Sequence, residues 1–110
     1  MKLPNGDQAV VPLTKLSGYL LSESHSVGTS KARFFRSIGF TEVNVASLKQ
    51  ELSRIARLED VQEVIATPYG SKYIVDGKLQ APSGKSISIR TIWILEEGRV
   101  EPRFVTAYPI

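Results

Sequence analysis

The chain has 110 residues, of which 42% are hydrophobic and 23% charged, so it is long enough for one domain and too short for two. It has no cysteine and one histidine, which excludes disulfide scaffolds, zinc–cysteine centres and mechanisms that need a histidine pair. The net charge of +3 permits an anionic partner without requiring one. No apolar run approaches the roughly 18 residues of a membrane span, and the start is unlike a signal peptide, so we expect a cytoplasmic protein.

Helical spacing of apolar residues dominates the first half of the chain. Leucines at this spacing after Pro12 predict a helix over about 12–21. A second helix is predicted over about 30–38, and Gly39 fits its C-terminal stop. A third is predicted over about 44–58, where apolar residues form one stripe.

After Asp60 the pattern changes to short β-rich runs separated by turn residues. The predicted strands cover residues 61–66, 73–79, 86–95 and 103–108. Asp76-Gly77 is a further turn candidate that would split the second of these runs. The order predicts a single α+β domain over residues 1–110, with three N-terminal helices packed on one face of a four-stranded antiparallel sheet.

The last two strands predict which residues share a face. If Gly98-Arg99 forms the hairpin tip, Thr91 lies opposite Thr106 and Trp93 opposite Phe104. One face then carries Thr91, Trp93, Phe104, Thr106 and Tyr108. The other carries Ile92, Ile94, Val105 and Ala107, and we expect the helices to cover it. A one-residue change in loop length would move Thr106 to the opposite side from Thr91.

The locally basic element lies in the second predicted helix, with Lys31, Arg33 and Arg36 and no acid. The glycine-containing segment 28–31 precedes this helix, where backbone N–H groups bind a phosphate or simply cap the helix. His25 lies in the preceding polar loop, as a general acid or base or as an exposed bystander.

Two further patterns are weaker. Gly84-Lys85-Ser86 is not a P-loop, because Leu79 stands where the leading glycine would be and a strand follows. Trp93 and Phe104 are expected in the core, whereas Tyr108 also fits a platform for stacking bases.

The chain also carries a set of short strings along nearly its whole length. These are Lys15 with Tyr19-Leu20-Leu21, His25-x-x-Gly28-x-x-Lys31-Ala32-Arg33-Phe34-Phe35, Gly70-x-Lys72-Tyr73-x-Val75-x-Gly77, Arg90-Thr91-Ile92-Trp93, and Pro102-Arg103-x-Val105-Thr106-Ala107-Tyr108-Pro109. In combination they resemble a family of small bacterial proteins known only as a domain of unknown function.

Helices followed by strands, with a last strand ending in Val-Thr-Ala-Tyr, are also similar to the barnase/EndoU/colicin/RelE superfamily of small ribonucleases, many of them toxins. This resemblance implies metal-independent RNA cleavage on the open face of the sheet, without a cofactor. The site it implies has His25, Lys31, Thr91 and Thr106 as catalytic residues and Arg33, Lys72, Arg90, Arg103 and Tyr108 as RNA-binding residues. Because EndoU-type enzymes use two histidines, Lys31, Lys72 or Tyr108 would take the second proton-transfer role.

Two functions follow as hypotheses. The first is an endoribonuclease toxin that binds RNA and is neutralised by a cognate antitoxin or immunity protein. The second is a non-catalytic binding or regulatory protein, itself an antitoxin or immunity partner, which the mild net charge and single histidine favour. The two differ in whether His25, Lys31 and Thr106 converge in an open cleft. The sequence does not give the oligomeric state.

Overall fold

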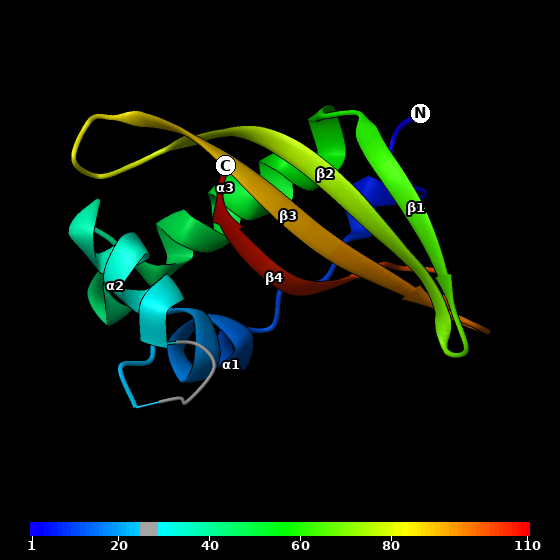
Figure 1. Ribbon diagram of the computed structural model, residues 1–110, viewed down its shortest axis with the longest axis horizontal. Coiled ribbons are helices and arrows are strands. Elements are labelled where there is room, and N and C mark those ends of the chain that lie inside the picture. Colours follow the sequence, from blue (N-terminus) through cyan, green and yellow to red (C-terminus); the bar gives the residue numbers. More distant parts are fainter. Residues whose placement is uncertain (25–28) are drawn as a thin grey trace.

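The fold combines short helices with one antiparallel sheet (Figure 1). The computed structural model describes residues 1–24 and 29–110. Its helical elements are η1 (Gly6–Gln8), α1 (Leu13–Lys15), the π-helix η2 (Leu16–Leu20), α2 (Thr29–Ser37), η3 (Glu42–Asn44) and α3 (Val45–Leu58). The strands β1 (Val61–Thr67), β2 (Gly70–Gln80), β3 (Ser86–Glu96) and β4 (Arg103–Pro109) pair in that order, so the predicted α+β class and four-stranded antiparallel sheet are confirmed.

Local chemistry accounts for where the helices begin and end. Gly39 follows α2 with a φ of 105°, a left-handed conformation that suits glycine and ends the helix. The Thr41 side chain accepts from the Val43 N–H, and Asn44 Oδ1 accepts from the Thr41 N–H, which starts η3 and leads into α3. Each helix among residues 1–24 and 29–110 is too short or too polar to span a bilayer.

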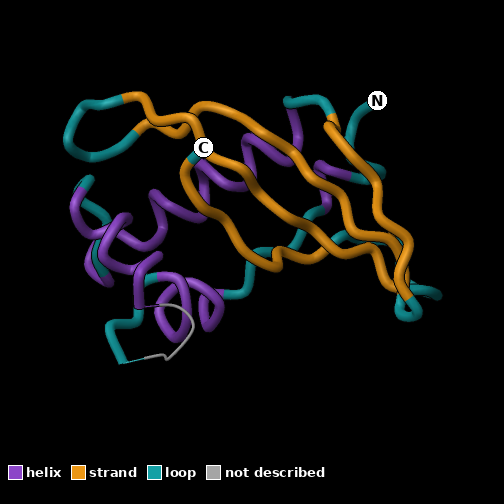
Figure 2. Tube along the Cα trace, in the orientation of Figure 1, coloured by secondary structure: helices purple, strands orange, loops and turns teal. Residues whose placement is uncertain are grey.

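The helices divide between two positions, as the tube view shows (Figure 2). Helix α3 lies along the sheet against β2, whereas α2 packs mainly against η2 at one end of the molecule. Gly77 permits the close approach of α3, because a Cβ there would lie 3.0 Å from Ile55 Cγ1. The predicted turn at Asp76-Gly77 is wrong, since β2 continues through both residues to meet this helix.

The buried face of the sheet is the opposite of the one expected from the sequence. Trp93 and Phe104 are 0% and 2% exposed and pack edge to face with their ring centroids 5.4 Å apart. Ile92, Ile94 and Val105, expected beneath the helices, are only partly buried. Fully burying the larger aromatic rings removes more apolar surface from water than burying isoleucine or valine.

A β-bulge explains why the register prediction held at one end of the hairpin and failed at the other. Trp93 lies opposite Phe104 as predicted, but the pairing shifts between Ile92 and Trp93. Val105 is therefore an extra residue on β4, and Ile92 rather than Thr91 faces Thr106. Thr91 and Thr106 consequently lie on opposite faces of the sheet.

We call the face away from α3 the outer face. Cross-strand partners share a face, so the pairing of β2, β3 and β4 assigns its members. They include Lys72, Asp76, Arg90, Ile92, Ile94, Arg103, Thr106 and Tyr108.

Candidate functional site

Three elements meet around the ring of Tyr19. Its hydroxyl lies 3.0 Å from Thr106 Oγ1 on β4, a hydrogen bond in which either oxygen can donate. The Nζ atoms of Lys15 and Lys31 lie 5.3 and 6.0 Å from the centroid of the same ring. Within about 6 Å a cation is attracted to an aromatic ring. These four residues, which we call the Tyr19 cluster, place two cations and two hydroxyls at the outer edge of β4.

Burial of the neighbouring leucines explains why Tyr19 lies there. Leu16, Leu20 and Leu21 are fully buried, which orients η2 and leaves Tyr19 at the margin of the core. The Leu21 N–H donates to the Leu16 carbonyl over 2.7 Å, the five-residue span of a π-turn. Lys31 reaches the ring from α2, which packs on η2. The cluster therefore depends on the packing of two helical segments against one strand.

Beside the cluster, Arg90 and Asp76 form an ion pair on the outer face. The Arg90 Nε and Nη2 atoms donate to the two carboxylate oxygens over 2.8 and 2.9 Å. Hydrogen bonding and charge attraction from Asp76, with a smaller contribution from Tyr108, raise the pKa of the guanidinium above its ordinary value. Arg90 is thus always charged, but Asp76 neutralises much of that charge. Tyr108 lies directly opposite Arg90 on β4.

Two other predicted cations, Lys72 and Arg103, flank Ile94 on the outer face. Lys72 lies opposite Ile94 on β2, and Arg103 lies opposite Ile94 on β4. Lys72 is half-buried and Arg103 is exposed. The structure thus brings Lys72, Arg90 and Arg103 to the face that also carries Thr106.

The predicted role of Thr91 is corrected. Its side chain has no exposed surface, donates to the Val75 carbonyl over 2.7 Å and accepts from Trp93 Nε1 over 2.8 Å. Both hydrogen bonds satisfy polar groups inside the core. Thr91 therefore belongs to the folding of the sheet and leaves the candidate site.

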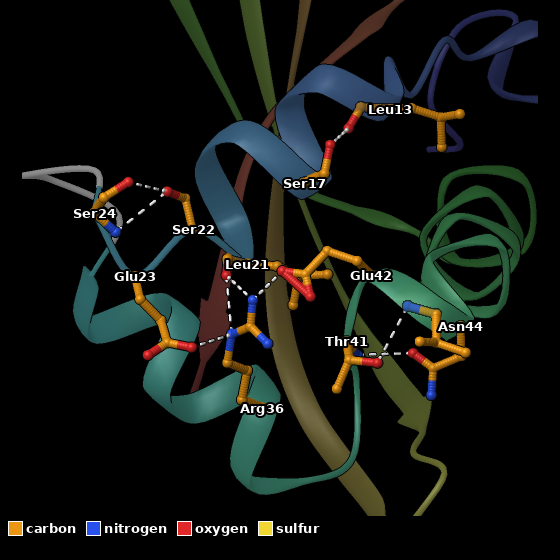
Figure 3. A network of polar contacts seen from close by, with 11 residues as sticks. Leu13, Ser17, Leu21, Ser22, Glu23, Ser24, Arg36, Thr41, Glu42 and Asn44 are labelled. Atoms are coloured by element: carbon orange, nitrogen blue, oxygen red, sulfur yellow. Dashed lines mark hydrogen bonds and ion pairs between the residues drawn. The ribbon is translucent and has the colours of Figure 1, made fainter.

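The basic residues of α2 have separate roles. Arg33 is exposed on α2. Arg36 instead donates from Nε and Nη2 to the Leu21 carbonyl over 3.0 and 2.7 Å, and pairs with Glu42 and Glu23 (Figure 3). Arg36 therefore links the end of η2, Glu23 and η3 through its hydrogen bonds and ion pairs.

His25 lies outside the described residues, together with positions 26–28, so its predicted role stays a prediction. The same holds for the phosphate-binding hypothesis at the segment 28–31. In the described part of the chain, no three side chains of the metal-ligating types Asp, Glu, His and Cys come together.

Lys15 and Tyr19 are not among the site residues predicted from the sequence. Their spacing indicates that the two side chains are close, because residues four apart share one face of a helix. The sequence does not reveal that this face meets Thr106, a contact between residues 87 positions apart.

Two grooves of the described chain lie away from the candidate site. One groove of about 590 Å³ is lined by α3 residues 46–57, and another of about 320 Å³ lies between α3 and the β2–β3 turn. Neither is lined by a member of the Tyr19 cluster. The predicted cations Lys72, Arg90 and Arg103 lie along neighbouring strands of the sheet, an arrangement that suits an extended anionic ligand.

Comparison with known proteins places this geometry in context. No curated protein matches the chain. A chain of the solved "Contact-dependent growth inhibition toxin - immunity protein complex from Klebsiella pneumoniae 342" shares the fold, with a TM-score of 0.73 and 19% sequence identity. The match covers 92% of this chain and 99% of that chain. The model of the family DUF6883, a domain of unknown function, matches residues 2–110, and this chain therefore belongs to that family, in line with the resemblance read from its sequence.

Proposed function

We propose that this protein is a toxin that cleaves RNA without a metal ion, at the Tyr19 cluster and the adjoining outer face. The observation that carries the proposal is the contact between the Tyr19 and Thr106 hydroxyls with two lysines beside it. Hydroxyl donors and ammonium groups are what a phosphodiester needs as negative charge grows on its oxygens.

The proposed reaction is the attack of a ribose 2′-oxygen on the adjacent phosphorus. A P–O bond to the 2′-oxygen forms while the bond to the 5′-oxygen breaks, which leaves a 2′,3′-cyclic phosphate and a 5′-hydroxyl end. One group accepts the 2′ proton and another supplies a proton to the leaving 5′-oxygen. His25 is the proposed acid or base, and Lys31 the stabiliser of charge on the phosphate. Of the Tyr19 and Thr106 hydroxyls, one donates to the other and the second donates to a non-bridging oxygen.

The outer face supplies the proposed binding track. Lys72 and Arg103 would contact phosphates on either side of Ile94, while Tyr108 offers a ring for a base next to Arg90. Arg33 extends the cationic surface along α2. A polymer is the proposed ligand because these residues follow neighbouring strands of the sheet.

A toxin of this kind requires a neutralising partner. The neighbour of known structure comes from a toxin–immunity complex, which supports a role in such a pair. We therefore propose a cognate immunity protein or antitoxin that covers the Tyr19 cluster, and action in the cytoplasm, where RNA is found.

The test is cleavage of single-stranded and hairpin RNAs by the purified protein with EDTA present. Tyr19→Phe removes one hydroxyl from the cluster, and Tyr69→Phe is its matched control because Tyr69 is 78% exposed elsewhere. His25→Ala should slow cleavage by roughly 100- to 10,000-fold. Fragments should carry 2′,3′-cyclic phosphate ends, and 2′-O-methyl RNA of the same sequence should stay intact.

A non-catalytic antitoxin or immunity role is the second candidate. The observations that favour it are the Asp76 carboxylate on Arg90 and the burial of Thr91, which withdraw two predicted phosphate contacts. Absence of cleavage by folded wild-type protein across varied RNAs, together with harmless expression in bacteria, would establish this alternative over the nuclease.

A further inference from the structure

The two edges of the sheet differ in how they are covered. Along β4, the Val10 carbonyl accepts from the Phe104 N–H over 2.9 Å, and Tyr19 reaches Thr106 further along. Along β1, only the start is held, where the Val61 N–H donates to the Met1 carbonyl over 2.6 Å. Beyond that point, β1 pairs with β2 alone among the described elements. Its other edge from residue 62 to 67 is open.

The open edge carries little protection against pairing beyond the bulge between Val61 and Glu63. Residues 62–66 are all exposed, and Val64 and Ile65 keep 45% and 41% of their surface. The strand contains one charged side chain, Glu63, and neither lysine nor proline. Edge strands normally carry such residues because unpaired N–H and C=O groups attract another strand. An uncovered edge with an exposed apolar segment, Val64–Ala66, is suited to strand addition.

We propose that β1 pairs antiparallel with β1 of a second copy of this chain, with the two-fold axis at Ile65. Ile65 then lies opposite its own counterpart, Val64 opposite Ala66, and Glu63 opposite Thr67. The two sheets join into one sheet of eight strands with closed two-fold symmetry. This inference does not depend on the proposed ribonuclease activity.

Backbone direction supports this register. The Val61 N–H already points to the open side, where it meets Met1. The bulge between Val61 and Glu63 shifts the alternation by one residue, so Val64 and Ala66 direct their N–H and C=O groups outward as well. Pairing Val64 with Ala66 of the second copy satisfies these groups. The pairing uses only the regular segment beyond the bulge.

Side-chain chemistry favours a second copy as the occupant. In the proposed register each Glu63 faces a threonine, so no like charges meet across the seam. Ile65 meets Ile65 on one face, and Val64 meets Ala66 on the other. Because the edge has one charged residue, it offers little to a strongly charged partner, whereas its own sequence complements it on both faces.

Cysteine pairs test the register directly, since the natural chain has no cysteine. Under mild oxidation Ile65→Cys should form a covalent dimer, because directly opposed side chains that do not share hydrogen bonds approach closely. Glu63→Cys alone should stay monomeric, since its own copy lies about 14 Å away along the strand. A mixture of Glu63→Cys and Thr67→Cys should form the mixed dimer. Equal cross-linking by all single variants, or none by Ile65→Cys, would overturn the proposal.

Sedimentation of the unmodified protein provides the second test. Wild type should show concentration-dependent dimers, and Ile65→Lys should abolish them. Gln80→Lys adds the same charge on an exposed position of β2 and should leave the dimer intact. Circular dichroism checks that each variant is folded. A wild type that stays monomeric at every concentration, or a dimer that survives Ile65→Lys, excludes this interface.

Discussion

The two faces of β3 both carry large apolar side chains, but only one of them is buried in the core. Thr91 and Trp93 point into the core with no exposed surface, and their polar atoms bond to each other. Arg90 and Ile92, their immediate neighbours in sequence, lie half-exposed on the outer face. A threonine thus serves folding on one side, while Thr106 on the other meets Tyr19 at the edge of an open surface.

This difference distinguishes polar groups that stabilise the fold from polar groups that are accessible to a ligand. A buried hydroxyl persists only when its hydrogen bonds are made inside the protein, as at Thr91. The polar groups of the outer face keep contact with water and can exchange it for a ligand. Substitutions on the two faces should therefore affect different measurements.

The largest expected effect is on stability at the inner face. Trp93→Ala should reduce the free energy of unfolding by about 3–5 kcal/mol, because it leaves a cavity beside Phe104 and removes a buried aromatic contact. Ile94→Ala on the outer face should cost about 1 kcal/mol, since that side chain is partly solvated. Urea denaturation measures both. Equal losses at the two positions would show that the faces are not distinct.

The next effect is on the rate of the proposed RNA cleavage. Lys31→Gln should reduce kcat/KM by about 100- to 1,000-fold, the cost of losing one electrostatic stabiliser of a developing anion. Lys49→Gln, an exposed lysine on α3, is the control for the loss of one charge and should change the rate little. A similar loss in both variants would point to general charge attraction rather than to the Tyr19 cluster.

A pair of threonine substitutions contrasts the faces most sharply. Thr91→Val should cost about 1–3 kcal/mol of stability, because Trp93 Nε1 loses its buried acceptor. Thr106→Val should cost less than about 1 kcal/mol, since its hydroxyl is only part-buried, yet it should impair cleavage. Denaturation and single-turnover kinetics on each protein decide the matter. Impaired stability at Thr106 with normal kinetics would assign that contact to folding.

The smallest effect concerns the ion pair of the outer face. Asp76→Asn removes the carboxylate that neutralises Arg90, so RNA should bind more tightly. The slope of log affinity against log salt should steepen by roughly 0.7 for single-stranded RNA, as one more phosphate contact forms. The folded state should change little, because the pair is partly exposed and the asparagine of this variant keeps a side-chain oxygen that can accept from Arg90. An unaltered slope would remove Arg90 from the binding track.

The sequence predicted the strands and the end of α2 because turn residues and Gly39 act locally. It failed on the faces of the sheet because β3 has Ile92 and Ile94 on one side and Thr91 and Trp93 on the other, so both sides carry large apolar residues. Alternation alone does not say which side a helix will cover. The bulge at Val105 has no composition signal either, and it decides that Thr106 lies on the outer face.

The candidate site was predictable in part. The resemblance to the ribonuclease superfamily implies Lys72, Arg90, Arg103 and Tyr108, and the fold brings these four residues to the outer face, where their role stays a prediction. Asp76 was not recognised as the partner of Arg90, because their contact depends on cross-strand register. The contact of Tyr19 with Thr106 depends on how η2 packs, which local patterns do not determine.

The direction in which the Tyr19 ring points depends on the number of residues in the π-turn at Leu16–Leu20. A π-turn holds one residue more than an α-helical turn, in the manner of a single-residue insertion. A Cβ added at Gly18, inside this turn, would meet open space, so packing does not require a glycine there. Each residue of an α-helix rotates the next by about 100°, so loss of one residue here would swing the Tyr19 ring away from β4 without altering any other amino acid. The hydrogen bond between Tyr19 and Thr106 therefore depends on the number of residues in this turn as much as on the tyrosine itself.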